Sequence, residues 1–418
     1  MSLNVAGGSA YYVGVDWAAV THAVCVLDPT GKRVAAFTVE HCAAGLTALT
    51  QRLARLGAPD TMPVGIERPD GRLVDALLEA GHPVVPVKPN AIKAWRDGEV
   101  LSGAKSDAGD AEVIAEYLRL RQHRLQLATP YTAQTKALRT VVRTRGDLVE
   151  LRVALTNQLT AVLDTHWPGA KEIFADVESP IALAFLTRYP TARHAQHLGV
   201  KRLTAFCVEH HYSGRRSGEQ LRTRLRAAPA GTLDETVCHA VSDAVTALVT
   251  VLTSLGAAVK TLDRSVTATL GKHPDAEIFT SLPRSGQINA AQILAEWGDC
   301  RQAYAGPDSI AALAGVTPVT KESGKHRAVH FRWACNKRFR VAMTTFADNS
   351  RHDSPWAAEV YTQARTRGHD HPHAVRILAR AWIRVMWRCW NDRVAYNPAR
   401  HGNAQRLTQP RQNEPLAA

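Results

Sequence analysis

Apolar and polar positions alternate between residues 11 and 40 in the pattern that is typical of β-strands. Three runs, YYVGVDWA, HAVCVLD and RVAAFTVE, are separated by turns such as PTGK and predict an antiparallel meander. Helical spacing follows over GLTALTQRLARLG, and strands and helices then alternate as far as a predicted helix over 107–121. These elements predict a mixed α/β sheet covered by helices. The polar stretch WRDGEVLSGAKSD, residues 95–107, is predicted to be a loop at the edge of the sheet.

The middle of the chain has a different pattern, with apolar residues at helical period over long distances. Residues 133–165 and about 232–270 each predict one long amphipathic helix, and the stretch between them is helical with interspersed prolines. Two such helices predict an antiparallel or intermolecular coiled coil. A plain helical bundle explains the same pattern. In either case we expect a spacer or a dimerisation element.

The last region begins with IFTSLPRSGQINAAQILAEWGD, a short helix, a turn and an apolar helix that resemble a helix–hairpin–helix. Such a turn offers backbone N–H groups to a phosphate. The final predicted helix, HAVRILARAWIRVMWRCWNDR, repeats arginine every four residues, and its tryptophans are predicted to pack in the core. We therefore predict an α/β domain over 10–130, a helical region over 131–270, a mostly helical domain over 271–398 and a disordered tail over 399–418.

The charge of the chain predicts a binding partner. The net charge is +13, and residues 300–418 hold 19 Lys and Arg against 8 Asp and Glu. Such a basic excess predicts contact with phosphate backbones. The seven cysteines form no C-x-x-C pair, so neither a zinc knuckle nor a disulfide framework is expected. No apolar stretch of about 20 residues and no signal peptide is found, which predicts a cytoplasmic protein without a membrane span.

Four acids are the candidate catalytic residues. Asp16 and Glu67 end predicted strands, and Asp107 and Asp110 share one face at the start of a predicted helix. A carboxylate at the end of a central strand is costly unless it is paired or binds a metal. Arg68 offers Glu67 a simple salt bridge, and acids on helices are usually solvated. If the four converge, they predict a divalent-metal site of the kind that cleaves phosphodiesters.

The order of these acids, on the first strand, a later strand and a final helix, is the one used by RNase H-like nucleases of the RuvC type. Sugar kinases and actin-like ATPases also begin with an aspartate-bearing strand and hairpin. They require a glycine-rich phosphate loop, however, and the turn DWAAVTH contains no glycine. The sequence therefore favours nucleic-acid chemistry over phosphate transfer from a nucleotide.

The motifs GVDWA, GIERPD and KSDAGDA, together with LPRSGQINAAQILAEWGD and LAGVTPVTKESGKHRAVHFRWACNKRFRVAM, resemble the DEDD transposases of bacterial insertion sequences. The specific group is the insertion-sequence one-ten family of bridge-RNA-guided recombinases, and the resemblance covers about residues 11–395. It implies a RuvC-like domain, a coiled coil and a transposase domain with a serine nucleophile. It also implies Mg²⁺ bound by the four acids, donor and target DNA, a guide RNA and a homo-oligomer, either a dimer or a tetramer.

The resemblance implies that Ser323, in VTKESGKHR, is the nucleophile. We expect a mobile polar loop there, in which basic side chains favour a phosphate and a developing alkoxide. Ser285 is the rival serine, and its place in a hairpin turn makes phosphate contact the better interpretation. The chain departs from the family in two places, with Cys335 before Asn336 and serine at position 285. The predicted nucleic-acid contacts are Lys105, Arg284, Ser285, Lys321, Lys325, Arg327, Lys337 and Arg338.

The sequence thus predicts a transposase that excises and inserts its own DNA element. Two alternatives stay open. A RuvC-like nuclease would hydrolyse DNA with two metals and form no covalent intermediate. A non-catalytic scaffold would bind nucleic acid without any metal-dependent activity.

Overall fold

The computed structural model describes residues 9–68, 70–99, 106–128, 130–323 and 326–401. The chain forms two units, each drawn from separate stretches of sequence. One contains the residues up to Thr132 together with Gly298–Trp333 and Ile383–Asn391. The other contains Ala133–Trp297, Ala334–Trp382 and the chain from Asp392 onward.

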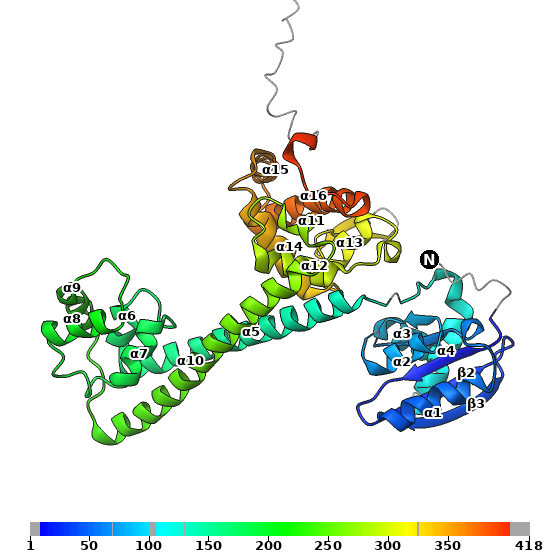
Figure 1. Cartoon of the computed structure of the whole chain (residues 1–418), viewed down its shortest axis with the longest axis horizontal. Coiled ribbons are helices and arrows are strands. Elements are labelled where there is room, and N and C mark those ends of the chain that lie inside the picture. Colours follow the sequence, from blue (N-terminus) through cyan, green and yellow to red (C-terminus); the bar gives the residue numbers. More distant parts are fainter. Residues whose placement is uncertain (1–8, 69, 100–105, 129, 324–325, 402–418) are drawn as a thin grey trace, which may run out of the picture. The chain divides into compact units, whose positions relative to one another are not determined.

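The N-terminal part of the first unit, blue in Figure 1, is built on a five-stranded sheet. The order of its strands is β3-β2-β1-β4-β5. β1, β2 and β3 form the predicted antiparallel meander, whereas β4 runs parallel to β1 and β5 runs parallel to β4. This confirms the mixed α/β sheet. The strands are β1 (Tyr12–Asp16), β2 (Thr21–Leu27), β3 (Arg33–Glu40), β4 (Val64–Ile66) and β5 (Val84–Pro86).

Helices cover both sides of this sheet. On one side, Val13 and Val15 of β1 pack with leucines of α1 and α2 in one buried cluster. On the other side α4 lies against β1 and β2, where Ala111 and Ala115 contact the thiol-bearing Cys25. Burial raises the pKa of Cys25 to about 11, which makes this thiol inert. The helical segments here are α1 (Ala43–Ala54), η1 (Pro59–Thr61), α2 (Arg72–Glu79), α3 (Pro89–Glu99), α4 (Asp107–Arg121) and η2 (Gln122–Arg124).

The loop predicted over residues 95–107 is wrong for its first five residues. Residues 95–99 belong to the helix α3, although their sequence is polar. The helix is held because Ile92 is buried against Ile114 and because Trp95 packs edge-on against Tyr117. One turn of apolar contacts is therefore enough to dock a helix whose other faces are charged. Residues 100–105 of the predicted loop lie outside the described residues.

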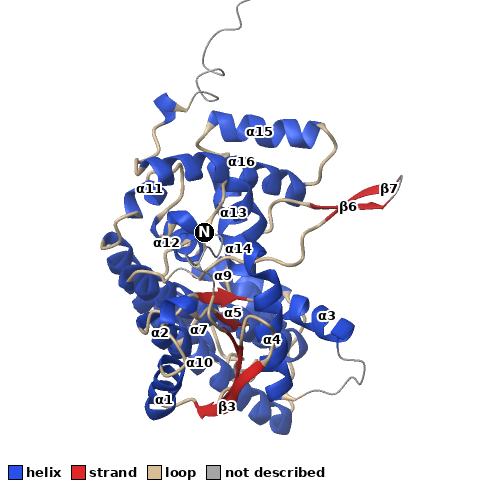
Figure 2. Ribbon diagram, turned by 90° about the vertical axis from the view of Figure 1, so that its right-hand side faces the viewer, coloured by secondary structure: helices blue, strands red, loops and turns tan. Residues whose placement is uncertain are grey.

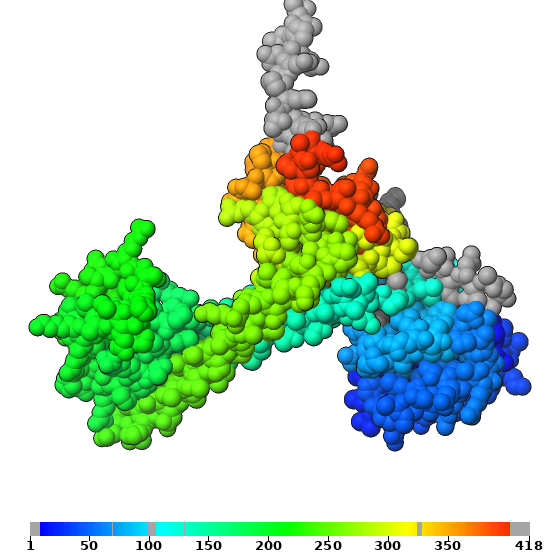
Figure 3. Space-filling view, viewed as in Figure 1, coloured from blue at the N-terminus to red at the C-terminus, as the bar shows by residue number. Residues whose placement is uncertain are grey.

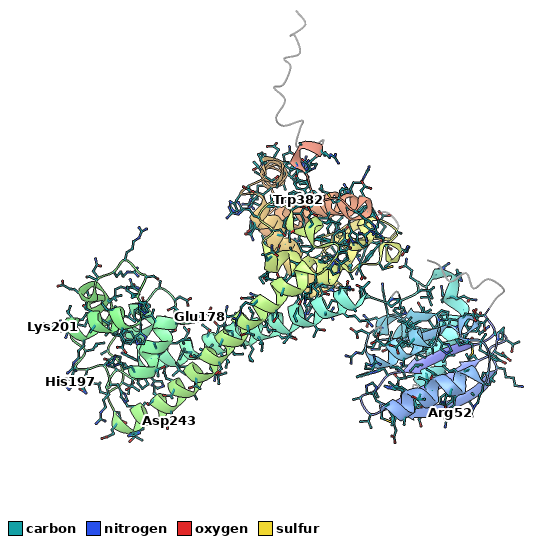
Figure 4. All side chains as sticks on the ribbon, in the orientation of Figure 1. Arg52, Glu178, His197, Lys201, Asp243 and Trp382 are labelled. Atoms are coloured by element: carbon teal, nitrogen blue, oxygen red, sulfur yellow. The ribbon has the colours of Figure 1, made fainter. Side chains whose placement is uncertain are left out.

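The second unit contains the two long helices, α5 (Ala133–His166) and α10 (Glu235–Gly271), which pack against each other as Figure 1 shows. Between them in sequence are α6 (Pro168–Ile173), α7 (Pro180–Arg188), α8 (Val200–Glu209) and α9 (Gly218–Ala227). These four helices and the adjoining turns of α5 and α10 share one hydrophobic core, and Figure 3 shows them as a rounded body. Glu178, labelled in Figure 4, ties this body to α5 through Thr156 Oγ1, which donates a hydrogen bond of 3.0 Å.

α10 is long and apolar enough, by length and composition alone, to cross a membrane, which the sequence did not predict. Val241, Val245, Val249 and Leu252 in its first half belong to the core shared with α5–α9. Thr135, near the start of α5, and His273, two residues beyond the end of α10, share a buried hydrogen bond of 2.8 Å. We therefore treat α10 as a helix of the folded protein.

Aromatic side chains form the core of the C-terminal part of the second unit. Trp382, labelled in Figure 4, is fully buried and packs edge-on against Phe346 and Trp356, which confirms the predicted core role of this tryptophan. Trp390 is also fully buried, whereas Trp387 is half-buried. The segments are α11 (Ala276–Thr280), α12 (Gln287–Trp297), η3 (Arg301–Ala303), α13 (Pro307–Leu313), β6 (Val319–Ser323), β7 (His326–His330), α14 (Lys337–Ser350), α15 (Pro355–Thr366), α16 (His371–Asp392) and η4 (Pro398–Arg400).

The prediction that Ser323 lies in a mobile loop is wrong, because Ser323 belongs to a two-stranded ribbon. β6 and β7 pair antiparallel from Val319 opposite His330 to Ser323 opposite His326, and Figure 2 shows the ribbon. The disordered tail predicted over 399–418 is wrong for its first residues, since His401 packs on the rings of Trp356 and Trp382. Residues 402–418 lie outside the described part of the chain.

Candidate nucleic-acid-processing site

Two of the four acids lie at the ends of neighbouring parallel strands. Asp16 is the last residue of β1, and Glu67 directly follows β4. The last pair in the parallel register is Val15 with Ile66, so the next position along each strand carries an acid. Both acidic side chains are half-buried. The register therefore places Asp16 and Glu67 at adjacent positions on one edge of the sheet.

α4 carries the other two acids in its first turn. Asp107 is exposed, whereas Asp110 is only 7% exposed. The helix can approach β1 closely because Gly14 has no side chain, and a Cβ there would clash with the carbonyl of Ala111. Since side chains alternate along a strand, Asp16 faces the same side of the sheet as Gly14. Strand and helix therefore present their acids to one side of the sheet.

Asp110 forms a mostly buried ion pair with Arg96 of α3, in which Nη2 lies 3.0 Å from Oδ1. Helix packing explains the pair. Ile92, one turn before Arg96, is clustered with Ile114, one turn after Asp110. A carboxylate with so little exposure requires a partner of this kind. The charge of Asp110 is thus balanced by a guanidinium in this structure.

Ring contacts and hydrogen bonds hold the residues that directly follow Asp16 and Glu67. The guanidinium carbon of Arg68 lies 4.5 Å from the ring centroid of Trp17, a cation–π distance. The Ala18 N–H donates to Nδ1 of His22 at 3.3 Å, which leaves Nε2 of His22 to donate to Nδ1 of His41 at 2.8 Å. Burial first and His41 second lower the pKa of His22, so this ring stays neutral at pH 7. These contacts order the chain next to both acids.

The donor set at this edge is made of carboxylates, the ligands that hard divalent cations such as Mg²⁺ prefer. Two of these acids lie at adjacent strand ends, and the other two lie on the helix that covers the same side. The chemistry of this set fits such an ion. Within the described ranges, however, no three His, Cys, Asp or Glu side chains form a group that could hold a metal. The acids therefore share an edge and a side of the sheet without forming a closed coordination sphere.

Ser323 lies at the end of the ribbon, as the last residue of β6, and it is exposed. The register pairs it with His326, the first residue of β7. Lys321 is also exposed and lies two positions away on the same strand, so both side chains share one face of the ribbon. The structure therefore presents the serine hydroxyl on a projecting strand pair with a lysine beside it.

Several predicted nucleic-acid contacts are only partly described. Lys105 and Lys325 lie outside the described residues, and Arg327 is placed in β7 by its backbone alone. Lys337 is exposed at the first position of α14. Arg338 is exposed as well, but its Nη2 lies 2.6 Å from a carboxylate oxygen of an aspartate in α5. Arg338 is thus partly neutralised within the protein.

The turn before α12 has an unusual backbone. Arg284 and Gly286 have φ angles of 54° and 62°, in the left-handed region, which costs an arginine about 1 kcal/mol. Between them, Ser285 is 3% exposed, and among the described residues its Oγ has no hydrogen-bond partner. A Cβ at Gly286 would meet nothing within 4 Å, so open space lies over the start of α12. Such a turn can present backbone N–H groups to an anion.

Glu296 of α12 was not among the predicted residues, yet it is 2% exposed and tightly bound. Arg143 donates to its two carboxylate oxygens at 2.8 Å each, and Asn336 Nδ2 donates at 2.7 Å. Asn336 also caps α14, because its Oδ1 accepts from the N–H of Phe339 at 3.1 Å. Burial alone would raise the pKa of Glu296, but hydrogen bonds from Arg143 and Asn336, with the charges of Arg143 and Arg139, lower it.

Replacing Glu296 with alanine is expected to lower the free energy of unfolding by about 1–3 kcal/mol, because it removes the hydrogen-bond partner of Arg143, whose side chain is partly buried. The pKa of Glu296 is lowered in the folded protein, so its stabilisation is complete above the ordinary value of 4.5 and is lost as the pH falls through the folded value. The difference in the free energy of unfolding between the wild type and Glu296→Ala should therefore become smaller as the pH falls below 4.5. Denaturant unfolding at several pH values, followed by tryptophan fluorescence, measures this.

The matched control for this measurement is Glu277→Ala, since Glu277 is an exposed glutamate on the neighbouring helix α11. A surface change of this kind should alter stability by less than about 0.5 kcal/mol. An equal loss in both variants, or a gap that is constant with pH, would show that the ion pair does not stabilise the fold.

Comparison with known protein families gives two matches along the chain. Residues 13–168 match the DEDD family of IS110, described as a transposase, and residues 276–362 match a family described as "Transposase IS116/IS110/IS902 family". The first match contains all four acids, and the second contains Ser285, Glu296 and Ser323.

Individual relatives match almost the whole chain. A protein from Streptomyces coelicolor named "Mini-circle putative transposase for IS117" is 30% identical over 400 residues, which is 93% of this chain and 96% of the relative. The "Insertion element IS116 uncharacterized 44.8 kDa protein" of Streptomyces clavuligerus is 28% identical over 393 residues, which is 93% of this chain and 96% of the relative. The resemblance seen in the motifs is therefore confirmed: the chain belongs to the IS116/IS110/IS902 family of transposases.

Proposed function

We propose that this transposase excises and inserts its insertion sequence through an acidic metal site and a serine nucleophile. The observation that carries the proposal is the placement of Asp16 and Glu67 at adjacent strand ends, with Asp107 and Asp110 on the helix that covers the same side. Transposases cleave and rejoin DNA, and four carboxylates placed in this way can bind the metal ions that such chemistry uses. The order of these acids in the sheet supports a RuvC-like domain.

The four acids would hold Mg²⁺, which supplies charge stabilisation to a phosphate when it is bound. The protein's own part is to place the carboxylates. β1 and β4 fix the two strand-end acids by their register. Arg96 orients Asp110 through Oδ1 and contributes positive charge at the same edge. Asp107, exposed at the start of α4, completes the set.

Ser323 would attack a DNA phosphate through its Oγ. A phosphoserine ester forms, the bond to one deoxyribose oxygen breaks, and that oxygen leaves as a hydroxyl after taking up a proton. In the second step a hydroxyl of another strand attacks the phosphoserine and restores a phosphodiester. Because each step exchanges one phosphate ester for another, joining requires no other energy source. The exposure of Ser323 on a ribbon supports access to a phosphate.

Nucleic-acid contacts and assembly involve other parts of the chain. The turn around Ser285, with its left-handed flanking residues, is suited to one backbone phosphate. The basic excess of the C-terminal region exceeds what one short duplex contact requires, which supports a guide RNA held by its backbone and shape. The pairing of α5 with α10 within the chain supports an antiparallel coiled coil. We also propose that the protein assembles into a homo-oligomer, as its resemblance to the family implies. We propose that the protein acts in the cytoplasm, where its DNA lies.

The test is excision from a DNA carrying the insertion sequence, by protein purified with the nucleic acid that it retains. RNA is expected to co-purify, and both ribonuclease treatment and EDTA should abolish excision, because RNA and metal each contribute to the complex. Adding back purified RNA or Mg²⁺ should restore activity and serves as the control. Full activity without RNA would disprove the guide, and activity in EDTA would disprove the metal site. Hydrolysed ends without joining would instead indicate a RuvC-like nuclease.

A further inference from the structure

The foot of the β6–β7 ribbon carries an exposed aromatic side chain that the proposed mechanism does not use. Trp333 is 79% exposed, and none of the large apolar side chains that the structure describes is more exposed. Most other tryptophans in this region are buried in the core. An exposed tryptophan presents a flat aromatic face to solvent, and such a face is suited to stacking on a base.

The indole is held in place rather than left loose. Phe331 meets Trp333 edge-on, with ring centroids 4.9 Å apart and an interplanar angle of 77°. Between them, Arg332 bonds back to the chain that enters the ribbon, with Nε donating to the Thr317 carbonyl at 3.1 Å and Nη2 donating to the Pro318 carbonyl at 3.3 Å. A side chain fixed in this way loses little further freedom on binding.

The charge of the segment that ends at Trp333 selects the kind of partner. In sequence, residues 319–333 contain four basic residues, Lys321, Lys325, Arg327 and Arg332, against the single acid Glu322. Of these, Arg332 is next to Trp333, and Lys321 is exposed on β6. An apolar protein surface or a lipid interior would require several neighbouring apolar side chains. One oriented indole within a basic segment instead suits a nucleic acid, whose bases present flat faces and whose backbone is negative.

We propose that Trp333 stacks on an unpaired base of the DNA undergoing strand exchange. The inference rests on the proposed function and adds the side chain that holds an exposed base close to the ribbon that carries Ser323. A base can offer its face to a side chain only where it has left the duplex stack, so the contact selects unpaired DNA over fully paired DNA.

The experiment compares the affinity of the full-length protein for a duplex with a short bulge, a fully paired duplex and an RNA of the bulged sequence, with 2-aminopurine in the bulge. Trp333→Ala should weaken binding to bulged DNA about tenfold, within the range for one lost stacking contact, and abolish quenching of the 2-aminopurine. Affinity for the paired duplex should stay unchanged. Trp333→Phe should restore most of both signals, because it retains an aromatic face.

Val329→Ala is the matched control, since Val329 is an exposed apolar residue on the same ribbon but has no aromatic face. Equal losses on bulged and paired DNA, or a loss confined to RNA, would overturn the inference. So would a change in oligomeric state, measured by light scattering, without any change in DNA binding. Ser323→Ala should lose strand exchange but retain the quenching. If Ser323→Ala still exchanged strands while the quenching stayed intact, the proposed function alone would be refuted.

Discussion

Ser323→Ala is expected to abolish DNA cleavage and the covalent protein–DNA adduct together, while DNA and RNA binding persist. Removing a nucleophile that acts directly lowers turnover by roughly 10⁵-fold or more. Binding should survive because Ser323 is one exposed hydroxyl on a ribbon whose basic neighbours are unchanged. The measurement is denaturing gel electrophoresis of protein incubated with end-labelled DNA, followed by peptide mapping of the linked residue.

Ser285→Ala serves as the control for this experiment, because Ser285 is a buried serine in the turn before α12 rather than an exposed one. It should retain the adduct, with weaker DNA affinity at most. An adduct mapped to Ser285 would contradict the proposed mechanism. Cleavage by Ser323→Ala, with no adduct in the wild type, would identify the protein as a nuclease that uses water.

Loss of any one acid should abolish strand exchange while the fold is retained. We expect Asp16→Ala, Glu67→Ala, Asp107→Ala and Asp110→Asn each to reduce the rate at least about a hundredfold, because a bound metal supplies several kcal/mol of charge stabilisation. Asparagine is chosen at position 110 because it keeps the shape of a side chain that is mostly buried against Arg96. Circular dichroism and a recombination assay measure fold and activity, and calorimetric titration with Mg²⁺ measures metal affinity.

The matched control is Glu112→Gln, since Glu112 is also on α4 but is half exposed and pairs with Arg33 at 3.2 Å. It should recombine like the wild type and bind Mg²⁺ with the same affinity. Recombination at the wild-type level by any two of the four acid variants would disprove the metal site, as would unchanged Mg²⁺ affinity in all of them.

The sheet and the long helices could be predicted because their signals are local. Alternation over β1–β3 and helical period over α5 and α10 are visible in any short window of sequence. The start of α4 is encoded in Ser106, whose side chain accepts a hydrogen bond from the N–H of Gly109. Such elements depend on neighbours a few residues away, so the sequence is sufficient to find them.

Other features depend on distant partners and were missed or mistaken. α3 is a polar helix held by contacts to α4, and β6 is mostly exposed, so neither shows the apolar periodicity that marks an element. The buried role of Glu296 depends on Arg143, which lies 153 residues away. For the acids, the sequence predicts residue types and strand ends, whereas their relation in space required the parallel register of β1 with β4.

The pairing of Arg143 with Glu296 has a consequence for the order in which the chain folds as it is made. The ribosome adds about 5–20 residues per second. Glu296, which lies 153 residues after Arg143, is therefore synthesised roughly 8–30 s later than Arg143. The strands and helices before Thr132 are complete by then, and their sheet contacts need nothing synthesised later. We therefore expect the acid-bearing sheet to form first on the nascent chain, and α5 to gain its final stability only when α12 emerges.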